Sequence, residues 1–171
     1  MSVFTSIEDT RTSLDAADYL IDDGMSMALF LAVKLGQPLL LEGEPGVGKT
    51  TAAKALAAAL GTDLIRLQCY EGIDSAQAVY DWDYSRQLLH LRAAEASGEA
   101  QGKGTAELEG QLYDERFLLK RALLRAIDHK NTTPPVLLID EIDRADDEFE
   151  AYLLEVLSDF QITVPEVGTF T

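Results

Sequence analysis

The sequence predicts an α/β domain in which helices pack on a parallel sheet. Short segments suited to strands lie at 39–41, 64–69 and 136–139. The first and third are apolar throughout, as in the buried strands of parallel sheets, and turn residues bound them. Stretches with apolar residues at helical spacing alternate with these segments, which is the chain order of strand–helix–strand units. A chain of 171 residues is long enough for one domain with a sizeable core.

The first third of the chain begins with a polar stretch that two helices follow. Residues 1–13 are expected to form a flexible N-terminus, and the folded core is expected to span 14–171. Apolar residues recur at helical spacing over 14–35 with an interruption at 22–24, which predicts two helices joined at that point. Gly36 and Pro38 then end the second helix.

The later part of the chain is expected to contain more helices, a loop and a hairpin. Small, polar and glycine-rich residues at 96–110 predict a mobile loop. Apolar residues spaced by three and four positions from Phe149 to Phe160 predict an amphipathic helix that begins at Asp147. The other expected elements are helices at 87–96 and 112–127 and a hairpin at 162–170.

The charge of the chain limits its partners. The formal net charge is −16, which repels nucleic-acid phosphates and disfavours adsorption to anionic membranes. No apolar stretch approaches the roughly 20 residues that a membrane span needs, and the first residues lack the pattern of a signal peptide. One cysteine, Cys69, cannot form an internal disulfide. These features predict a soluble cytoplasmic protein that does not bind nucleic acid.

A glycine-rich turn stands between the first strand and an alanine-rich helix. It fits G-x-x-x-x-G-K-[ST], a pattern whose backbone N–H groups surround phosphates while the lysine reaches the β and γ phosphates and the threonine hydroxyl binds magnesium. The helix that begins near Lys49 directs its positive dipole end at the same charge. The alternative is a strand-to-helix turn with an incidental lysine. The candidate nucleotide contacts are Gly43, Glu44, Pro45, Gly46, Val47, Gly48, Lys49, Thr50 and Thr51.

Two adjacent acids end the apolar strand at 136–139. Ligands bind at the carboxyl ends of the strands in open α/β sheets, so Asp140 is expected to hold Mg²⁺ together with Thr50. Glu141 is expected to orient and polarise the attacking water, which makes Glu141 and Lys49 the candidate catalytic residues. The alternative is that both acids cap the segment that follows. Together the two motifs predict a three-layer α/β/α P-loop fold that binds ATP or ADP with Mg²⁺.

Other reactive residues have structural explanations. His90 and His129 lack partners at the spacing of a zinc site or a catalytic triad, so packing or surface positions are favoured. Tyr80, Trp82 and Tyr84 form either a local aromatic cluster or a loop that contacts a partner. Arg144 either pairs with nearby acids or faces a neighbouring subunit.

The two motifs and the chain around them resemble the MoxR family of AAA+ ATPases. The resemblance covers about residues 14–170 and rests on the segments 39–50 and 138–145. Segments 70–84 and 112–118 are similar to the subgroup associated with maturation of carbon monoxide dehydrogenase and related metalloenzymes. The stretch 70–84 is the more specific part, because many families share the phosphate loop.

The resemblance implies an assembly and a role. It implies a hexameric ATPase that acts as a chaperone on a client metalloenzyme, beside a partner with a von Willebrand factor A domain. It also implies that residues near Tyr19 and Ile21 approach the adenine, that an insert falls near 72–86, and that the hairpin at 162–170 is the pre-sensor insertion.

The sequence departs from this family at Thr171, where it ends before the strand that carries sensor 1. The arginine finger and helical lid of the family would follow that strand, so we expect a partial AAA+ core, incomplete at the C-terminus, with very slow turnover by itself. A second hypothesis is a nucleotide-binding interaction module with little or no turnover. A small-molecule kinase is a weaker third, because Asp140 and Glu141 followed by Asp143 and Arg144 suit an ATPase better.

Overall fold

The computed structural model describes residues 4–98 and 110–171. Their contacts divide them into two compact units. Unit 1 comprises the described residues of 1–69 together with 129–142, and unit 2 comprises those of 70–128 together with 143–171. Most of the loop expected at 96–110 lies outside the described residues.

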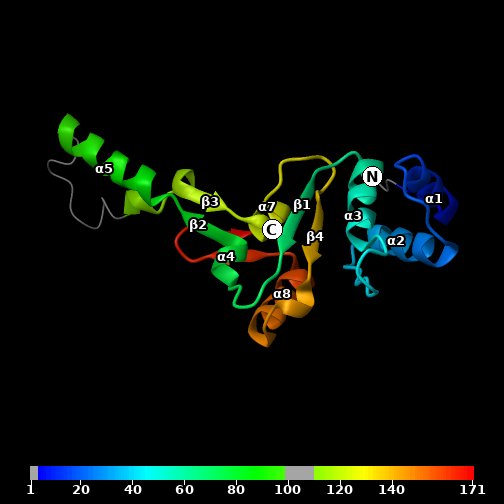
Figure 1. Ribbon diagram of the computed structural model, residues 1–171. Coiled ribbons are helices and arrows are strands. Elements are labelled where there is room, and N and C mark those ends of the chain that lie inside the picture. Colours follow the sequence, from blue (N-terminus) through cyan, green and yellow to red (C-terminus); the bar gives the residue numbers. More distant parts are fainter. Residues whose placement is uncertain (1–3, 99–109) are drawn as a thin grey trace. The chain divides into compact units, whose positions relative to one another are not determined.

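Unit 1 contains a parallel pair of strands. Strands β1 (Leu64–Gln68) and β4 (Val136–Asp140) pair in register from Leu64 opposite Val136 to Gln68 opposite Asp140. Helix α3 (Lys49–Leu60) contacts both strands and ends at Gly61, whose left-handed conformation (φ 62°) suits a glycine C-cap. Figure 1 shows β1 and β4 side by side. The predicted α/β fold with a parallel sheet is confirmed.

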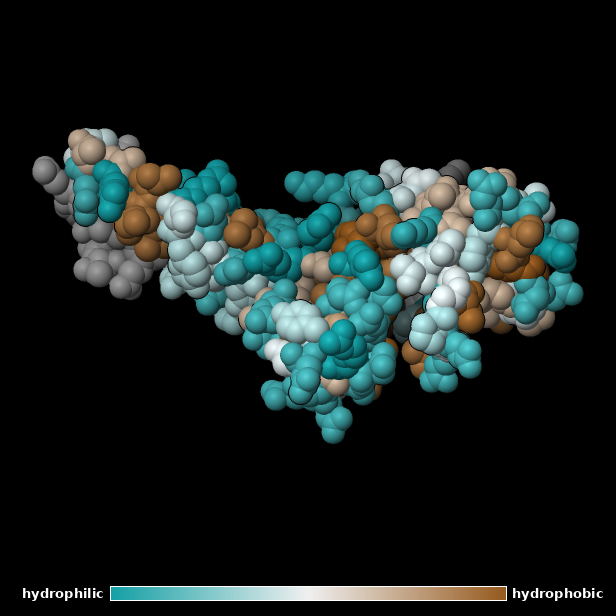
Figure 2. Space-filling model, in the orientation of Figure 1, coloured by the Kyte–Doolittle hydropathy of each residue, from teal (hydrophilic) through white to brown (hydrophobic). Residues whose placement is uncertain are grey.

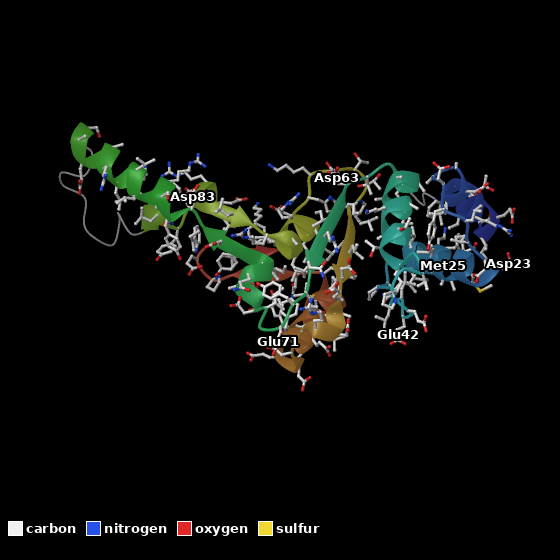
Figure 3. The ribbon with its side chains drawn as sticks, in the orientation of Figure 1. Asp23, Met25, Glu42, Asp63, Glu71 and Asp83 are labelled. Carbon is white, nitrogen blue, oxygen red and sulfur yellow. The ribbon has the colours of Figure 1, made fainter. Side chains whose placement is uncertain are left out.

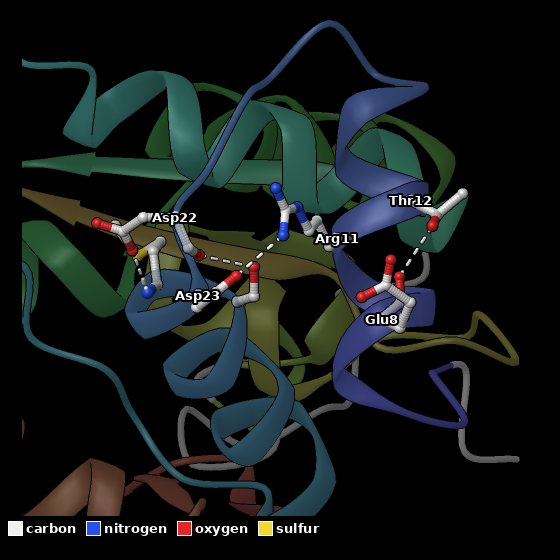
Figure 4. A network of polar contacts seen from close by, with 7 residues as sticks. Glu8, Arg11, Thr12, Asp22 and Asp23 are labelled. Carbon is white, nitrogen blue, oxygen red and sulfur yellow. Dashed lines mark hydrogen bonds and ion pairs between the residues drawn. The ribbon is translucent and has the colours of Figure 1, made fainter.

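Two helices precede this sheet. Helix α1 (Ile7–Asp15) begins after Ser6, whose hydroxyl accepts the Asp9 N–H, and helix α2 (Asp23–Leu35) begins after Asp22, whose carboxylate accepts the Met25 N–H. An ion pair of 2.9 Å between Arg11 and Asp23 links the two helices (Figure 4). Helix α1 therefore occupies part of the segment 1–13 that was expected to be flexible. The N-cap explains the difference, because it satisfies helix N–H groups within a polar sequence.

A small apolar cluster joins these helices to α3. It contains Leu14 of α1, Leu29 of α2 and Ala55 of α3, each at most 4% exposed. Tyr19 and Ile21, which lie between α1 and α2, pack against the same cluster. The chain before the sheet is thus attached to the helix that follows the glycine-rich turn.

The segment 39–41 does not form the expected strand. It has no strand assignment, and Leu39 and Leu40 are 38% and 69% exposed. A strand is defined by its hydrogen-bonded ladder, and among the described residues no strand pairs with this segment. Apolar composition predicted a buried strand here, but the three leucines have no strand assignment and two of them are exposed.

Unit 2 contains a second sheet that was not expected. Helix α4 (Ser75–Val79) leads into β2 (Tyr80–Trp82), which pairs antiparallel with β3 (Leu118–Lys120), and helix α5 (Tyr84–Ser97) follows β2. Figure 2 shows hydrophobic surface over α5, where Leu88 and Leu89 are 50% and 65% exposed.

The prediction of a single helix over 112–127 is wrong. The chain forms a 3₁₀ turn, η1 (Glu115–Phe117), then β3, then a short helix α7 (Ala122–Ile127). Pairing with β2 extends beyond β3 at both ends, because the Asp83 N–H donates to Phe117 and the Arg121 N–H donates to Val79. These hydrogen bonds between distant segments override the helical spacing of the apolar residues.

The remainder of the chain agrees with the sequence. After β4 come a 3₁₀ turn, η2 (Ile142–Arg144), helix α8 (Asp147–Asp159) and an antiparallel hairpin of β5 (Ile162–Val164) and β6 (Gly168–Phe170). Phe149, Leu153 and Val156 form the buried face of α8 as predicted, whereas Phe160 ends the helix and is 47% exposed. In the part of the chain that the structure describes, no helix has the length and hydropathy to cross a membrane.

The contribution of the Thr5–Asp9 hydrogen bonds, at the start of α1, to folding stability should depend on pH. The Thr5 N–H donates to the Asp9 carboxylate at 2.8 Å, and this hydrogen bond, followed by one from the Thr5 hydroxyl, lowers the pKa of Asp9 below its ordinary value. A lowered folded-state pKa gives stability that is present above the unfolded-state pKa, near 4 for aspartate, and is lost as pH falls through the folded-state pKa. We expect the wild-type protein to lose more unfolding free energy than Asp9→Asn between pH 5 and pH 3, as measured by urea unfolding. Equal losses would contradict this assignment.

Candidate functional site

The glycine-rich turn has the backbone that the motif requires. Gly43, Gly46 and Gly48 have φ values of 155°, 85° and 99°, which side chains strongly disfavour. A Cβ atom on Gly43 would lie 3.3 Å from the Val47 side chain, and one on Gly48 would lie 3.6 Å from the Tyr19 ring. Glycine is therefore needed at these positions for conformation and, at Gly43, also for space.

Helix α3 begins directly after this turn with its N–H groups available. Its N-cap is Gly48, which makes no side-chain cap hydrogen bond, and the first helical bond runs from the Ala52 N–H to the Gly48 carbonyl. The N–H groups of the first turn have no partner within the helix. A 12-residue helix with such an N-terminus attracts an anion through both its donors and its dipole.

Lys49 folds its side chain back over the turn. Its ammonium group donates to the carbonyl of Glu44 at 2.9 Å and also to the carbonyl of Gly43. Both acceptors belong to the first residues of the turn, so the positive charge is held beside the backbone that would surround a phosphate. Glu42, labelled in Figure 3, lies immediately before the turn and is exposed.

Thr50 and Asp140 converge although 90 residues separate them in sequence. The Thr50 hydroxyl lies 3.4 Å from Oδ2 of Asp140. The β1–β4 ladder fixes Asp140, because Gln68 lies opposite it and the Cys69 N–H donates to its carbonyl at 2.9 Å. The Asp140 carboxylate contacts the side chains of Thr50 and Arg66.

This pair of oxygens suits magnesium. Mg²⁺ prefers hard oxygen ligands and is usually held by one or two protein groups together with water and substrate phosphates. Within residues 4–98 and 110–171, no group of three or more His, Cys, Asp or Glu side chains forms a richer metal site. The threonine hydroxyl and the aspartate carboxylate beside the glycine-rich turn are oxygen ligands of the kind that Mg²⁺ takes together with substrate phosphates.

Glu141 has an unusual backbone. Its φ is 54°, in the left-handed region, where a non-glycine residue is disfavoured by roughly 1–2 kcal/mol. The residue is exposed and follows directly after the strand that carries Asp140. Such an outlier at the carboxyl end of a strand supports a functional role for its side chain.

Arg66 and Gln68 were missed by sequence reasoning. The Arg66 guanidinium donates to Oδ2 of Asp140 from Nη2 at 2.7 Å and from Nε at 3.1 Å, and it also donates to the Gln68 side chain. The available signal was the pair of polar residues at alternate positions of an otherwise apolar strand, which places both on one face.

The remaining candidate nucleotide contacts lie around the turn. Tyr19 reaches it, because its hydroxyl donates to the Gly48 carbonyl at 3.3 Å. Ile21 packs on the apolar cluster of α1, α2 and α3, and Thr51 is exposed on the first turn of α3. Pro45 and Val47 are also exposed. Contact of Tyr19 and Ile21 with adenine stays a prediction.

The aromatic residues of unit 2 form a local cluster. Trp82, only 7% exposed, makes edge contacts with Tyr80 and Tyr113 at ring-centroid distances of 6.1 and 5.2 Å. Tyr84 is 68% exposed.

Both histidines make polar contacts near the surface. Nε2 of His90 lies 3.1 Å from Nη2 of Arg116, and Nδ1 of His129 lies 3.2 Å from the Asn131 carbonyl oxygen.

Comparison with known proteins identifies the family. Residues 39–169 match the model of the ATPase family associated with various cellular activities (AAA). The chain is 30% identical over 162 residues to a mitochondrial Lon protease homolog of Phaeodactylum tricornutum, covering 88% of this chain and 15% of that protein. It is 28% identical over 162 residues to the Lon protease of Halothermothrix orenii, covering 88% of this chain and 17% of that protein. No solved structure matches significantly.

The family match and the geometry of the site involve the same residues. The chain spans less than a fifth of the length of these curated relatives, so the likeness concerns one region of much longer proteins. The family match begins at the segment before the glycine-rich turn and contains Lys49, Thr50, Asp140 and Glu141. The chain belongs to the AAA family of ATPases.

Proposed function

We propose that this protein binds ATP with Mg²⁺ and hydrolyses it as a MoxR-type chaperone. The observation that carries ATP binding is the convergence of Thr50 and Asp140 at 3.4 Å, beside a turn whose glycines and Lys49 suit a polyphosphate. Membership of the AAA family supports both nucleotide binding and hydrolysis.

Each residue has a distinct part in the proposed reaction. The N–H groups at the start of α3 and the Lys49 ammonium bind and orient the phosphates. Thr50 and Asp140 would hold magnesium, which supplies charge neutralisation and polarisation of the terminal phosphoryl group. Glu141 would orient water and accept its proton, a role that its position directly after Asp140 at the end of β4 supports.

The MoxR proposal rests on the segments 39–50 and 138–145, and its subgroup depends on segments outside these motifs. Residues 70–84 and 112–118 resemble the subgroup that matures carbon monoxide dehydrogenase and related metalloenzymes. The proposed biological role is therefore remodelling of a client metalloenzyme in the cytoplasm. The proposed assembly is a hexamer that works beside a protein with a von Willebrand factor A domain.

Asp140→Asn tests the proposed metal–nucleotide site. In the wild-type protein, ADP should bind more tightly with Mg²⁺ than with EDTA, because Asp140 contributes a metal ligand. In Asp140→Asn, calorimetry should give nearly the same affinity in both conditions. Asp143→Asn removes an exposed acid three residues away and should keep the wild-type difference.

Two outcomes would separate the hypotheses. If the wild-type protein bound ADP equally with Mg²⁺ and EDTA, the metal role of Asp140 would be wrong. If binding were metal-dependent but a phosphate-release assay gave no turnover above that of Glu141→Gln, the second hypothesis of a nucleotide-binding interaction module would replace ATP hydrolysis.

A further inference from the structure

The magnesium-binding carboxylate has a guanidinium as its ion-pair partner. Nε and Nη2 of Arg66 both donate to Oδ2 of Asp140, at 3.1 and 2.7 Å. The Thr50 hydroxyl faces the same oxygen at 3.4 Å. Arg66 therefore uses the carboxylate oxygen that lies nearest to the other expected metal ligand.

The fold builds this ion pair through strand register. Side chains at alternate positions of a strand share one face, and partners across a parallel pair point to the same side. Because Gln68 lies opposite Asp140, Arg66 and Gln68 lie on the same side of the sheet as Asp140. The Gln68 side chain also accepts a hydrogen bond from Arg66, so the guanidinium is directed by two neighbours.

The burial of the two groups differs. The Asp140 side chain is 21% exposed, whereas the Arg66 side chain is 52% exposed. The carboxylate is thus held within the site, while the guanidinium can withdraw toward solvent without breaking a packed core. A metal ion that takes Oδ2 competes with the guanidinium for that oxygen, so binding of one weakens the contact of the other.

We propose that Arg66 is a displaceable counter-ion that makes metal binding at Asp140 depend on nucleotide. The proposal rests on the proposed function and adds a positioning residue to it. Arg66 weakens the binding of a divalent cation in the absence of nucleotide, because the cation must then break the ion pair without phosphate ligands to compensate. It also neutralises Asp140 toward a nucleotide that arrives without metal, so the carboxylate does not repel the phosphates.

Arg66 is thus proposed to lower the affinity for metal alone and to raise the affinity for nucleotide without metal, so its removal should shift the two affinities in opposite directions. In Arg66→Gln, Mn²⁺ alone should bind about two- to fivefold more tightly, a change typical of one partly exposed ion pair. ADP in EDTA should bind more weakly by a similar factor. A merely structural role of Arg66 would weaken both, so the opposite shifts separate the proposal from general damage.

The experiment uses the purified protein with Mn²⁺ as the metal probe. Electron paramagnetic resonance measures bound Mn²⁺ without nucleotide, and calorimetry measures ADP binding with EDTA. Because the chain is strongly acidic, Asp140→Asn defines the Mn²⁺ that binds elsewhere. The double variant with Arg66→Gln and Asp140→Asn should lose the gain in Mn²⁺ affinity.

Arg11→Gln is the matched control. It removes the same charge from an ion pair in unit 1, the pair with Asp23 on α1 and α2 that is drawn in Figure 4. Both affinities should stay at wild-type values. If Arg66→Gln does not fold by circular dichroism, Arg66→Lys replaces it, and the same opposite shifts are expected at smaller size, because lysine keeps the charge but not the two-donor fork.

The results separate failure of the counter-ion proposal from failure of the proposed function. If the wild-type protein bound no ADP even with Mg²⁺, the proposed function itself would fail. If it bound ADP with Mg²⁺ but Arg66→Gln matched Arg11→Gln in both assays, or weakened both affinities, the counter-ion role alone would be overturned.

Discussion

Replacing Lys49 by alanine should weaken ATP binding by about a hundredfold or more. Hydrogen bonds to charged groups contribute roughly 1.5–3 kcal/mol each, and the ammonium is expected to contact more than one phosphate oxygen. The same substitution removes the contacts that hold the ammonium to the carbonyls of Gly43 and Glu44. Isothermal titration calorimetry with ATP and Mg²⁺ measures the change.

The control for this variant lies on the same helix. Lys54 is exposed on α3, one and a half turns beyond the glycine-rich turn, and Lys54→Ala makes the same change in charge and side-chain size. It should bind ATP as the wild-type protein does. Equal affinities for Lys49→Ala and Lys54→Ala would refute the phosphate-binding role of Lys49.

Replacing Glu141 by glutamine should slow hydrolysis while ATP stays bound. Loss of a positioned base costs about 10²–10⁴ in rate, and glutamine has nearly the same shape but no charge to accept a proton. Glutamine can adopt the same left-handed backbone (φ 54°), and circular dichroism checks that the variant is folded. Single-turnover phosphate release measures the rate, and calorimetry measures the affinity.

An acid seven residues further along the chain provides the comparison. Glu148 is exposed near the start of α8, and Glu148→Gln should release phosphate at the wild-type rate. Glu141→Gln with wild-type turnover would remove Glu141 from the chemistry. A variant that lost affinity as much as rate would instead indicate that Glu141 binds the metal–nucleotide complex.

The sequence predicted the glycine-rich turn better than it predicted the strands. A local motif dictates backbone geometry, and the positive φ values of Gly43, Gly46 and Gly48 agree with the glycines that the motif requires. The proximity of Thr50 and Asp140 followed from a general rule, because both lie where ligands bind parallel sheets. These inferences need no knowledge of which distant segments pair.

Distant pairing explains what the sequence did not predict. The leucines at 39–41 have strand composition, but none of the described strands pairs with them. The segment 112–127 has helical spacing but contributes β3 to a ladder with β2. Arg66 is a similar case. Arg66 contacts Asp140 only because β4 pairs with β1. The sequence around a single arginine in a short strand does not show which distant acid it will pair with.

The N–H of Cys69 anchors the carbonyl of Asp140 and thereby sets the alignment of the two strands. Side chains alternate between faces, so a single-residue insertion between Arg66 and Cys69 would turn Arg66 to the opposite face of the sheet. Both sequence motifs would survive such an insertion unchanged, yet the carboxylate would lose its neighbour. Insertions of two residues would restore the face and move Arg66 by one strand repeat. The tolerance of this protein to length changes in β1 should therefore alternate between odd and even insertions.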